Sequence, residues 1–115
     1  MDFSVRMFHL NEYLIKKRKY SIADQVFRSG TSIGANPSEA KRAESESDFV
    51  HKYSIAMKEA EETLYWLELA YRTELLEEKL YLSLRSDCEE LLKLGTSITL
   101  TMLRKIKAEK TSGNT

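Results

Sequence analysis

Residues 28–39, Arg-Ser-Gly-Thr-Ser-Ile-Gly-Ala-Asn-Pro-Ser-Glu, decide the fold, because their residue types and their spacing favour different structures. Glycine, serine and proline are typical of turns, and Asn36 before Pro37 is biased away from helical dihedral angles. Apolar and small residues nevertheless recur at steps of three and four from Val26 to Ala40. This period predicts a helix with a surface of small residues, in which Pro37 removes a backbone hydrogen bond and bends the axis.

The composition indicates one domain of long helices. The chain has 115 residues, 42% of them hydrophobic, which is enough for one self-sufficient core. One proline and four glycines leave few places to turn, which favours helices over a many-stranded sheet. The 18 basic and 18 acidic residues cancel, so the net charge points neither to nucleic acid nor to membrane as a partner.

The cysteine content and the hydropathy pattern bear on location. Cys88 is the only cysteine, which excludes an internal disulfide and fits a reducing compartment. The first dozen residues contain charges rather than an apolar signal-peptide segment. The uncharged run 94–103 is too short and too polar to cross a bilayer. We therefore expect a cytoplasmic protein with no membrane partner.

The apolar period extends over the rest of the chain and predicts an all-α, four-helix bundle in a single domain of residues 1–110. The expected helices cover residues 3–18, 21–44, 48–73 and 77–108, and a frayed tail covers 111–115. Ser21 with Asp24 resembles a capping box for the second helix, and Ser47 or Asp48 can cap the third. Short connections make neighbouring helices antiparallel, in an up-down-up-down order.

The third helix has two apolar sides. One side forms a regular seam for the bundle, whereas Ile55, Trp66 and Leu69 project to nearly the opposite side, with Tyr65 close to them. Leaving such groups in water forgoes roughly 1.5–3 kcal/mol each. We expect these four residues to contact another subunit, although scattered exposed apolar side chains are also ordinary.

Charge separates between the two ends of the predicted bundle. Antiparallel helices bring one set of basic residues to one end: Lys41, Arg42, Lys52, Arg104, Lys105 and Lys107. The other end holds several glutamates and Asp87, which face the cations of residues 16–19. A basic end is where an anionic polymer would bind, and the alternative interpretation is ordinary solvated helix ends.

The sequence offers no catalytic or metal-binding arrangement. Residues 30–34 lack the glycine spacing and the Lys-Ser/Thr pair of a phosphate-binding loop. Asp48 and His51 form only one imperfect pair, whereas a di-iron bundle needs two Glu-x-x-His pairs and two more glutamates. Cys88 lies on the predicted seam, as a core residue rather than a reactive thiol. We predict no catalytic residue, no metal and no cofactor.

Two segments carry a resemblance to a known family. Residues 24–36 (DQVFRSGTSIGAN) with Glu39, and residues 48–70 (DFVHKYSIAMKEAEETLYWLELA), resemble the four-helix-bundle family of 23S ribosomal RNA intervening-sequence proteins. Its members are often called ribosomal proteins of that type. The similarity covers the second and third helices and, more weakly, the fourth.

The resemblance implies a left-handed up-down-up-down bundle, a ring-shaped homopentamer and no established enzymatic activity. A related branch consists of accessory proteins of diversity-generating retroelements, which are similar pentamers that bind nucleic acid and a reverse transcriptase.

These observations support two hypotheses about function. The first is a non-enzymatic, oligomeric protein that associates with structured RNA through its basic end. Its expected phosphate contacts are Arg28, Lys41, Arg42, Lys52, Arg104 and Lys105. The second is a protein-interaction scaffold, an accessory subunit for another protein such as one of the reverse-transcriptase type.

Overall fold

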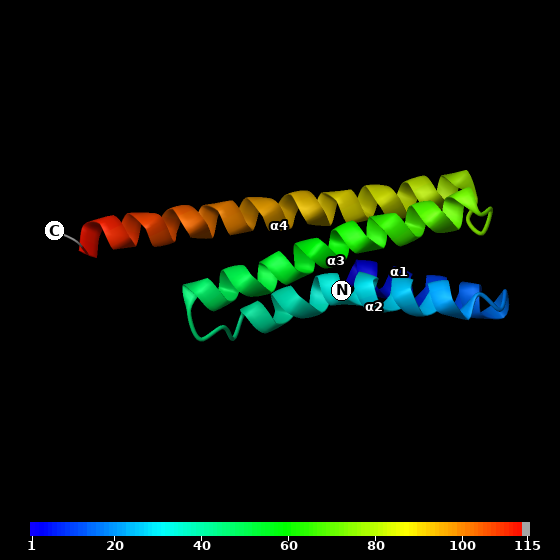
Figure 1. Ribbon diagram of the computed structural model, residues 1–115, viewed down its shortest axis with the longest axis horizontal. Coiled ribbons are helices and arrows are strands. Elements are labelled where there is room, and N and C mark those ends of the chain that lie inside the picture. The colour runs from blue at the N-terminus through cyan, green and yellow to red at the C-terminus, as the bar shows by residue number, and fades with distance from the viewer. Residues whose placement is uncertain (114–115) are drawn as a thin grey trace.

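The protein consists of four helices (Figure 1). A computed structural model describes residues 1–113, in which no strand occurs. The helices are α1 (Asp2–Lys16), α2 (Tyr20–Ala40), α3 (Glu46–Arg72) and α4 (Glu78–Gly113). This confirms the predicted all-α architecture of four helices.

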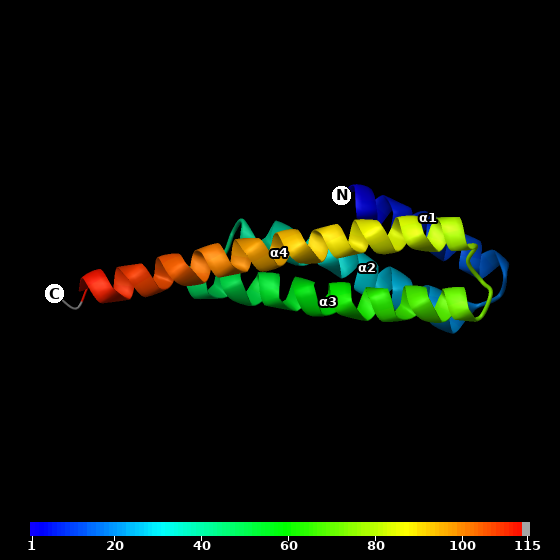
Figure 2. The ribbon, with the colours of Figure 1, turned by 90° about the horizontal axis from the view of Figure 1, so that it is seen from above.

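The helices form an elongated molecule of 62 × 23 × 20 Å. Each helix packs against the next one in the sequence, and the chain turns back at each short connection (Figures 1 and 2). Arg6 of α1 also pairs with Asp87 of α4, with 2.5 Å between Nη1 and Oδ2. Because α1 has 15 residues and α4 has 36, the last part of α4 extends beyond the other helices (Figure 2).

The core follows the predicted seams. The buried residues of α1 are Phe3, Met7, Leu10 and Leu14, which recur at steps of four, three and four. They meet seam residues from the other helices, among them Val26, Ile33, Leu67, Leu84 and Cys88. Full burial of one large aliphatic side chain stabilises the fold by about 1.5–3 kcal/mol, so this cluster accounts for much of the driving force for folding.

The stretch 28–39 is helical, as its spacing predicts, and α2 continues through Pro37. The hydroxyl groups of Ser29, Thr31 and Ser32 donate to backbone carbonyls four residues earlier, at 2.8, 2.6 and 2.7 Å. Asn36 Nδ2 donates to Ser32 O in the same way, at 3.0 Å. These side chains therefore bond within the helix instead of forming the turn that their residue types suggest.

Two glycines allow methionines of neighbouring helices to approach closely. A Cβ atom at Gly30 would lie only 2.5 Å from Met7 Cγ of α1. A Cβ atom at Gly95 of α4 would likewise collide with Met57 of α3. Each glycine costs roughly 1 kcal/mol of helix propensity, and close interhelical packing offsets that cost.

Several helix ends differ from the predictions. The N-cap of α2 is Lys19 rather than Ser21, and the N-cap of α3 is Ser45, whose Oγ accepts from Asp48 N at 3.0 Å. The second helix ends at Ala40, four residues early, because the chain closes there in i to i−3 bonds. The fourth helix includes 111–113 of the expected frayed tail, and residues 114–115 lie outside the described part.

Two connections, at the end of the bundle opposite Lys41 and Lys105, contain a non-glycine residue in the left-handed region of backbone dihedral angles. Arg18 has φ 60° after α1, and Glu74 has φ 63° after α3. In each case the next amide bonds back across the helix end, Lys19 N to Leu14 O at 2.9 Å and Leu75 N to Ala70 O at 2.8 Å. These are Schellman motifs, in which glycine is the usual left-handed residue.

Candidate nucleic-acid interface

Five of the six proposed phosphate contacts lie at one end of the bundle, where α2 ends, α3 begins and α4 passes. Two ion pairs place these segments side by side: Lys52 Nζ lies 2.9 Å from Glu39 Oε2, and Lys105 Nζ lies 3.1 Å from Glu46 Oε1. We call Lys41, Arg42, Lys52, Arg104 and Lys105 the basic pole.

Two members of the basic pole are already paired with carboxylates. Hydrogen bonding to Glu39 raises the pKa of Lys52, and hydrogen bonding to Glu46 raises the pKa of Lys105. The bond from Lys105 in turn lowers the pKa of Glu46. These pairs tie α3 to α2 and to α4, so their ammonium groups are less available to an external phosphate.

The other three members are exposed. Lys41, Arg42 and Arg104 form no ion pair within residues 1–113. Beyond Arg104, the last turns of α4 add exposed Lys107 and Lys110, with Glu109 as the one acidic residue after position 104. The part of the pole with an excess of free positive charge is therefore the connection after α2 together with the projecting end of α4.

Arg28, the sixth proposed contact, lies in the middle of the bundle. Its guanidinium donates to Glu59 Oε2 at 3.1 Å, to Gln25 Oε1 and to Glu62, and the hydrogen bond with Glu62 raises its pKa. Thirteen residues separate Arg28 from Lys41 on or just after α2, which corresponds to about 20 Å along a helix. Arg28 thus links α2 to α3, apart from the basic pole.

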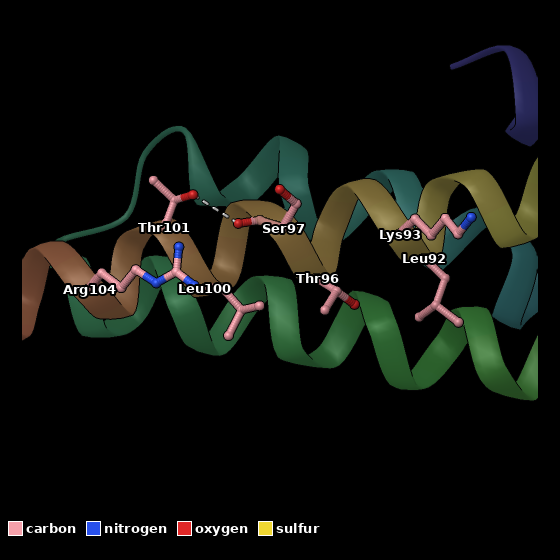
Figure 3. Close-up of a pocket in the computed structure, with 7 residues that line it drawn as sticks. All are labelled: Leu92, Lys93, Thr96, Ser97, Leu100, Thr101 and Arg104. Atoms are coloured by element: carbon pink, nitrogen blue, oxygen red, sulfur yellow. Dashed lines mark hydrogen bonds between the residues drawn. The ribbon is translucent and has the colours of Figure 1, made fainter.

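A shallow hollow of about 430 Å³ adjoins the pole along α4 (Figure 3). All its lining residues belong to α4, from Leu92 to Arg104. Figure 3 shows Leu92 and Leu100 on one side of the helix and Arg104 beyond Thr101, whose hydroxyl donates to Ser97 O at 3.0 Å. Because one helix supplies every wall, this hollow is a surface depression rather than an enclosed site.

The four residues predicted for a subunit interface fall into two groups. Tyr65 and Leu69 are exposed, with 59% and 37% of their surface accessible. Ile55 and Trp66 are half-buried, and Trp66 packs against the core. The single chain therefore covers part of the second apolar side of α3.

A further apolar surface lies between α1 and α2, and sequence analysis did not identify it. Phe8 and Phe27 meet edge to face with ring centroids 6.5 Å apart, yet they remain 51% and 36% exposed beside exposed Val5. The available signal was the placement of Val5 and Phe8 off the Phe3–Met7 seam of α1.

The one cysteine of the chain lies in the core. Cys88 is buried, its Sγ lies 3.4 Å from Ala60 O, and burial raises its pKa to about 12. Within residues 1–113, His, Cys, Asp and Glu side chains form no group that could hold a metal ion. In the same range, no helix combines the length and the apolar character that crossing a membrane requires.

Comparison with known families identifies the chain. The model of the 23S rRNA-intervening sequence protein family matches residues 1–97. The chain belongs to this family. The match includes Arg28, Lys41, Arg42 and Lys52, whereas Arg104 and Lys105 lie beyond it.

A solved protein has a similar structure. It is a protein of unknown function from the S23 ribosomal protein family of Bacteroides thetaiotaomicron, 46% identical to this chain. The match covers 85% of this chain and 92% of that one, with a TM-score of 0.83. Comparison with curated proteins yields no match.

Proposed function

We propose that this member of the family is a non-enzymatic protein that associates with structured RNA through the basic pole. The observation that carries the proposal is the set of exposed, unpaired cations Lys41, Arg42 and Arg104 at one end. The 23S rRNA-intervening sequence family, to which the chain belongs, links it by name to ribosomal RNA. The one cysteine is buried and fits both a cytoplasmic location and the lack of thiol chemistry.

The positions of the cations indicate which of them are free to contact phosphate groups. Lys41 and Arg42 stand on the short connection after α2, and Arg104, Lys107 and Lys110 follow one another along the projecting end of α4. Such an arrangement positions positive charge against a phosphate backbone without reading bases, so binding depends on salt and on RNA shape. Lys52, Lys105 and Arg28 first have to release glutamate partners and contribute less.

Filter binding to a synthetic RNA stem-loop tests this proposal. We compare Lys41→Gln/Arg42→Gln/Arg104→Gln with a control that removes the same charge elsewhere, Lys16→Gln/Lys58→Gln/Lys79→Gln, at exposed positions without ion pairs. Three lost phosphate contacts flatten the slope of log affinity against log salt by about 2–3. Equal losses in both triple variants, or no binding even at low salt, contradict the proposal.

Self-association is the second element of the proposal: a left-handed, up-down-up-down bundle that repeats in a homopentameric ring. Two apolar surfaces support it, Phe8 with Phe27 and Tyr65 with Leu69. Thr63 Oγ1 donates to Ser29 Oγ at 2.9 Å, which fixes the register of α2 against α3.

This register places the two apolar surfaces at the same height. Phe27 lies two residues before Ser29 and Tyr65 two residues after Thr63, and the two helices run in opposite directions. Copies standing side by side can therefore join one surface to the other without an axial shift. A heterologous contact of that kind closes into a ring rather than growing into a filament.

Mixing two variants tests the heterologous contact. Phe8→Glu and Tyr65→Glu each spoil one surface, so each variant alone should sediment as a monomer. An equal mixture should form dimers, because each variant retains the surface that the other has lost. Wild-type protein that stays monomeric at micromolar concentration, or a mixture that forms no dimer, contradicts this arrangement.

A protein-interaction scaffold is the second candidate function. Leu94, Leu100 and Leu103 of α4 favour it, since they are 58%, 47% and 46% exposed on a helix that other segments cover only in part. Capture of a protein partner that survives nuclease treatment supports the scaffold, whereas loss of the partner after nuclease treatment favours RNA association.

A further inference from the structure

An apolar groove opens where α1 stops. Ser4 near the start of α1 lies beside Gly34, where a Cβ atom would be 3.3 Å from Ser4 Oγ, and α2 continues for six residues past this point. Figure 1 shows the N-terminus at mid-length, while α2, α3 and α4 continue beyond it. Over this length three helices, with the start of α1 closing one end, line a groove of about 620 Å³.

The groove walls continue the seams that form the core elsewhere. Ile33 and Pro37 come from α2, Tyr53 and Met57 from α3, and Leu94 and Ile98 from α4. Ile98 lies two heptads after buried Leu84, yet it is only half-buried, and Leu94 is 58% exposed. The groove is therefore the position that a fourth helix would occupy, left empty because α1 is shorter than its neighbours.

Lys41 is the one charged side chain among the residues that line the groove. No acidic residue lines it, and Lys41 lies at its far end without an ion pair within residues 1–113. At the near end, Asp2 in the first turn of α1 lies in the smaller adjoining hollow and offsets the positive end of that helix dipole. Tyr53 also forms no hydrogen bond among the described residues, so its hydroxyl is available to an acceptor.

We propose that this groove binds an acidic amphipathic helix from a partner protein, in the position that α1 leaves empty. Apolar side chains of that helix pack between Ile33, Met57 and Ile98, and one of its carboxylates pairs with Lys41. From Gly34 to Lys41 the groove extends about 10 Å, or about two helical turns. This inference rests on the scaffold function, the second candidate above.

Other occupants fit the groove less well. The projecting end of α4 from a second copy carries Arg104, Lys107 and Lys110, which would place like charges near Lys41. An RNA strand needs several cations, and the groove offers one lysine among apolar walls. A small ligand would stay largely in water, because the exposed Leu94 forms an open edge, whereas small-molecule sites enclose most of their ligand.

Fluorescence anisotropy with the full chain and a synthetic helical peptide tests the proposal. The probe is a peptide of about 15 residues, long enough for marginal helicity, with leucines on one face and glutamates elsewhere. The matched control peptide has lysine in place of each glutamate. We expect the acidic peptide to bind at least about tenfold more tightly than the basic one, which corresponds to about 1.4 kcal/mol.

Two matched pairs of variants locate the site. Leu94 lines the groove, so Leu94→Glu should weaken binding of the acidic peptide at least about tenfold. Leu100 is exposed on the same helix outside the groove, so Leu100→Glu should change that binding less than about twofold. Lys41→Glu should reverse the preference between the peptides, and Lys93→Glu should not. Both leucines are exposed, so circular dichroism melts should show that these variants fold.

The outcomes separate the groove from the wider scaffold function. Equal binding of both peptides, or equal weakening by Leu94→Glu and Leu100→Glu, overturns the groove proposal. Nuclease-resistant capture of a protein partner that Leu94→Glu leaves intact overturns it as well, while the scaffold function stands. Absence of both peptide binding and partner capture removes the two together.

Discussion

The two halves of α4 carry the same apolar period and have different fates. In the first half, Leu84 and Cys88 are 2% and 0% exposed because the other helices surround them. In the second half, Ile98 and Met102 lie on the same side of the helix, two heptads after Leu84 and Cys88, yet they are only half-buried because α1 does not extend this far. A periodic pattern therefore marks a surface suited to packing, and the neighbouring helices decide whether that surface is buried.

The features that bear on stability and on function are divided between the same two halves. The first half of α4 lies in the packed part of the molecule. Within the described residues, this part contains the buried thiol of Cys88 and the stacked rings of Tyr71 and Tyr81, whose centroids lie 4.4 Å apart. The open half holds the basic pole, the apolar groove and the uncovered leucines. The family match ends at residue 97, close to where the packing thins.

Truncating one leucine in each half gives the largest expected difference. Leu84→Ala leaves a cavity among well-packed neighbours and should lower the free energy of unfolding by about 2–4 kcal/mol. Leu100→Ala removes an exposed side chain and should change it by no more than about 0.5 kcal/mol. Urea denaturation followed by circular dichroism measures both, and similar losses would show that the open half is covered in solution.

Substituting alanine for each of two glycines of α2 tests where along this helix the close packing ends. Gly30→Ala collides with Met7 and should destabilise the protein by about 1–3 kcal/mol despite the gain in helix propensity. Gly34→Ala meets only Ser4 Oγ, at 3.3 Å, and should be neutral or stabilising by up to about 1 kcal/mol.

Thermal melts of the two glycine variants provide the measurement. A stable Gly30→Ala variant would mean that Met7 moves aside easily and that α1 packs loosely against α2. That result would remove the close approach inferred for this part of the packed half.

Glycine at a position with left-handed dihedral angles after a helix should stabilise the packed half modestly. Glu74 has φ 63°, which strains a residue with a Cβ atom, so Glu74→Gly should raise the free energy of unfolding by about 0.5–1 kcal/mol. Glu77→Gly, in the same connection without a positive φ, serves as the control and should lower stability or leave it unchanged. A loss of stability in Glu74→Gly during urea denaturation contradicts this account.

The smallest effect concerns pH at the open end. Hydrogen bonding from Lys105 lowers the pKa of Glu46 below its ordinary value of 4.5. Because this carboxylate is more acidic in the folded state, its stabilising contribution is complete above that value and is lost as the pH falls through the lowered pKa. The pKa of neighbouring Glu109, raised by its hydrogen bond with Glu46, opposes this effect in part.

A carboxyl NMR titration measures this pair directly. Lys105→Met should raise the pKa of Glu46 towards its ordinary value, and Lys107→Met, which removes a cation outside the pair, should leave it nearly unchanged. An unchanged Glu46 pKa in Lys105→Met would mean that the end of α4 does not stay beside the start of α3.

The sequence predicted the local features of the fold well. The seam Phe3–Leu14 of α1 and the helical state of residues 28–39 both follow from steps of three and four residues, which the structure preserves. The caps were predicted less well. Ser21, Ser45, Ser47 and Asp48 all have suitable side chains, and the choice among them depends on where each helix meets its neighbour.

The candidate site was predicted only in part. Antiparallel helices bring Lys41, Lys52 and Lys105 to one end, as expected, but the sequence did not indicate that Lys52 and Lys105 pair with glutamates or that Arg28 bonds to Glu59 and Glu62. Ion pairs between helices depend on axial register, and the buried contact between Ser29 and Thr63 fixes that register only for α2 against α3.

By itself, the sequence determined the number of helices, their approximate lengths and the apolar side of each, because helical periodicity is a local property of the chain. Only the tertiary structure decided which parts of those sides are covered, because coverage depends on where α1 ends relative to the longer helices. The stretch 28–39 shows both effects. Its spacing made it a helix, and the position of α1 buried Gly30 beneath Met7 while it left Gly34 and Pro37 along an open groove.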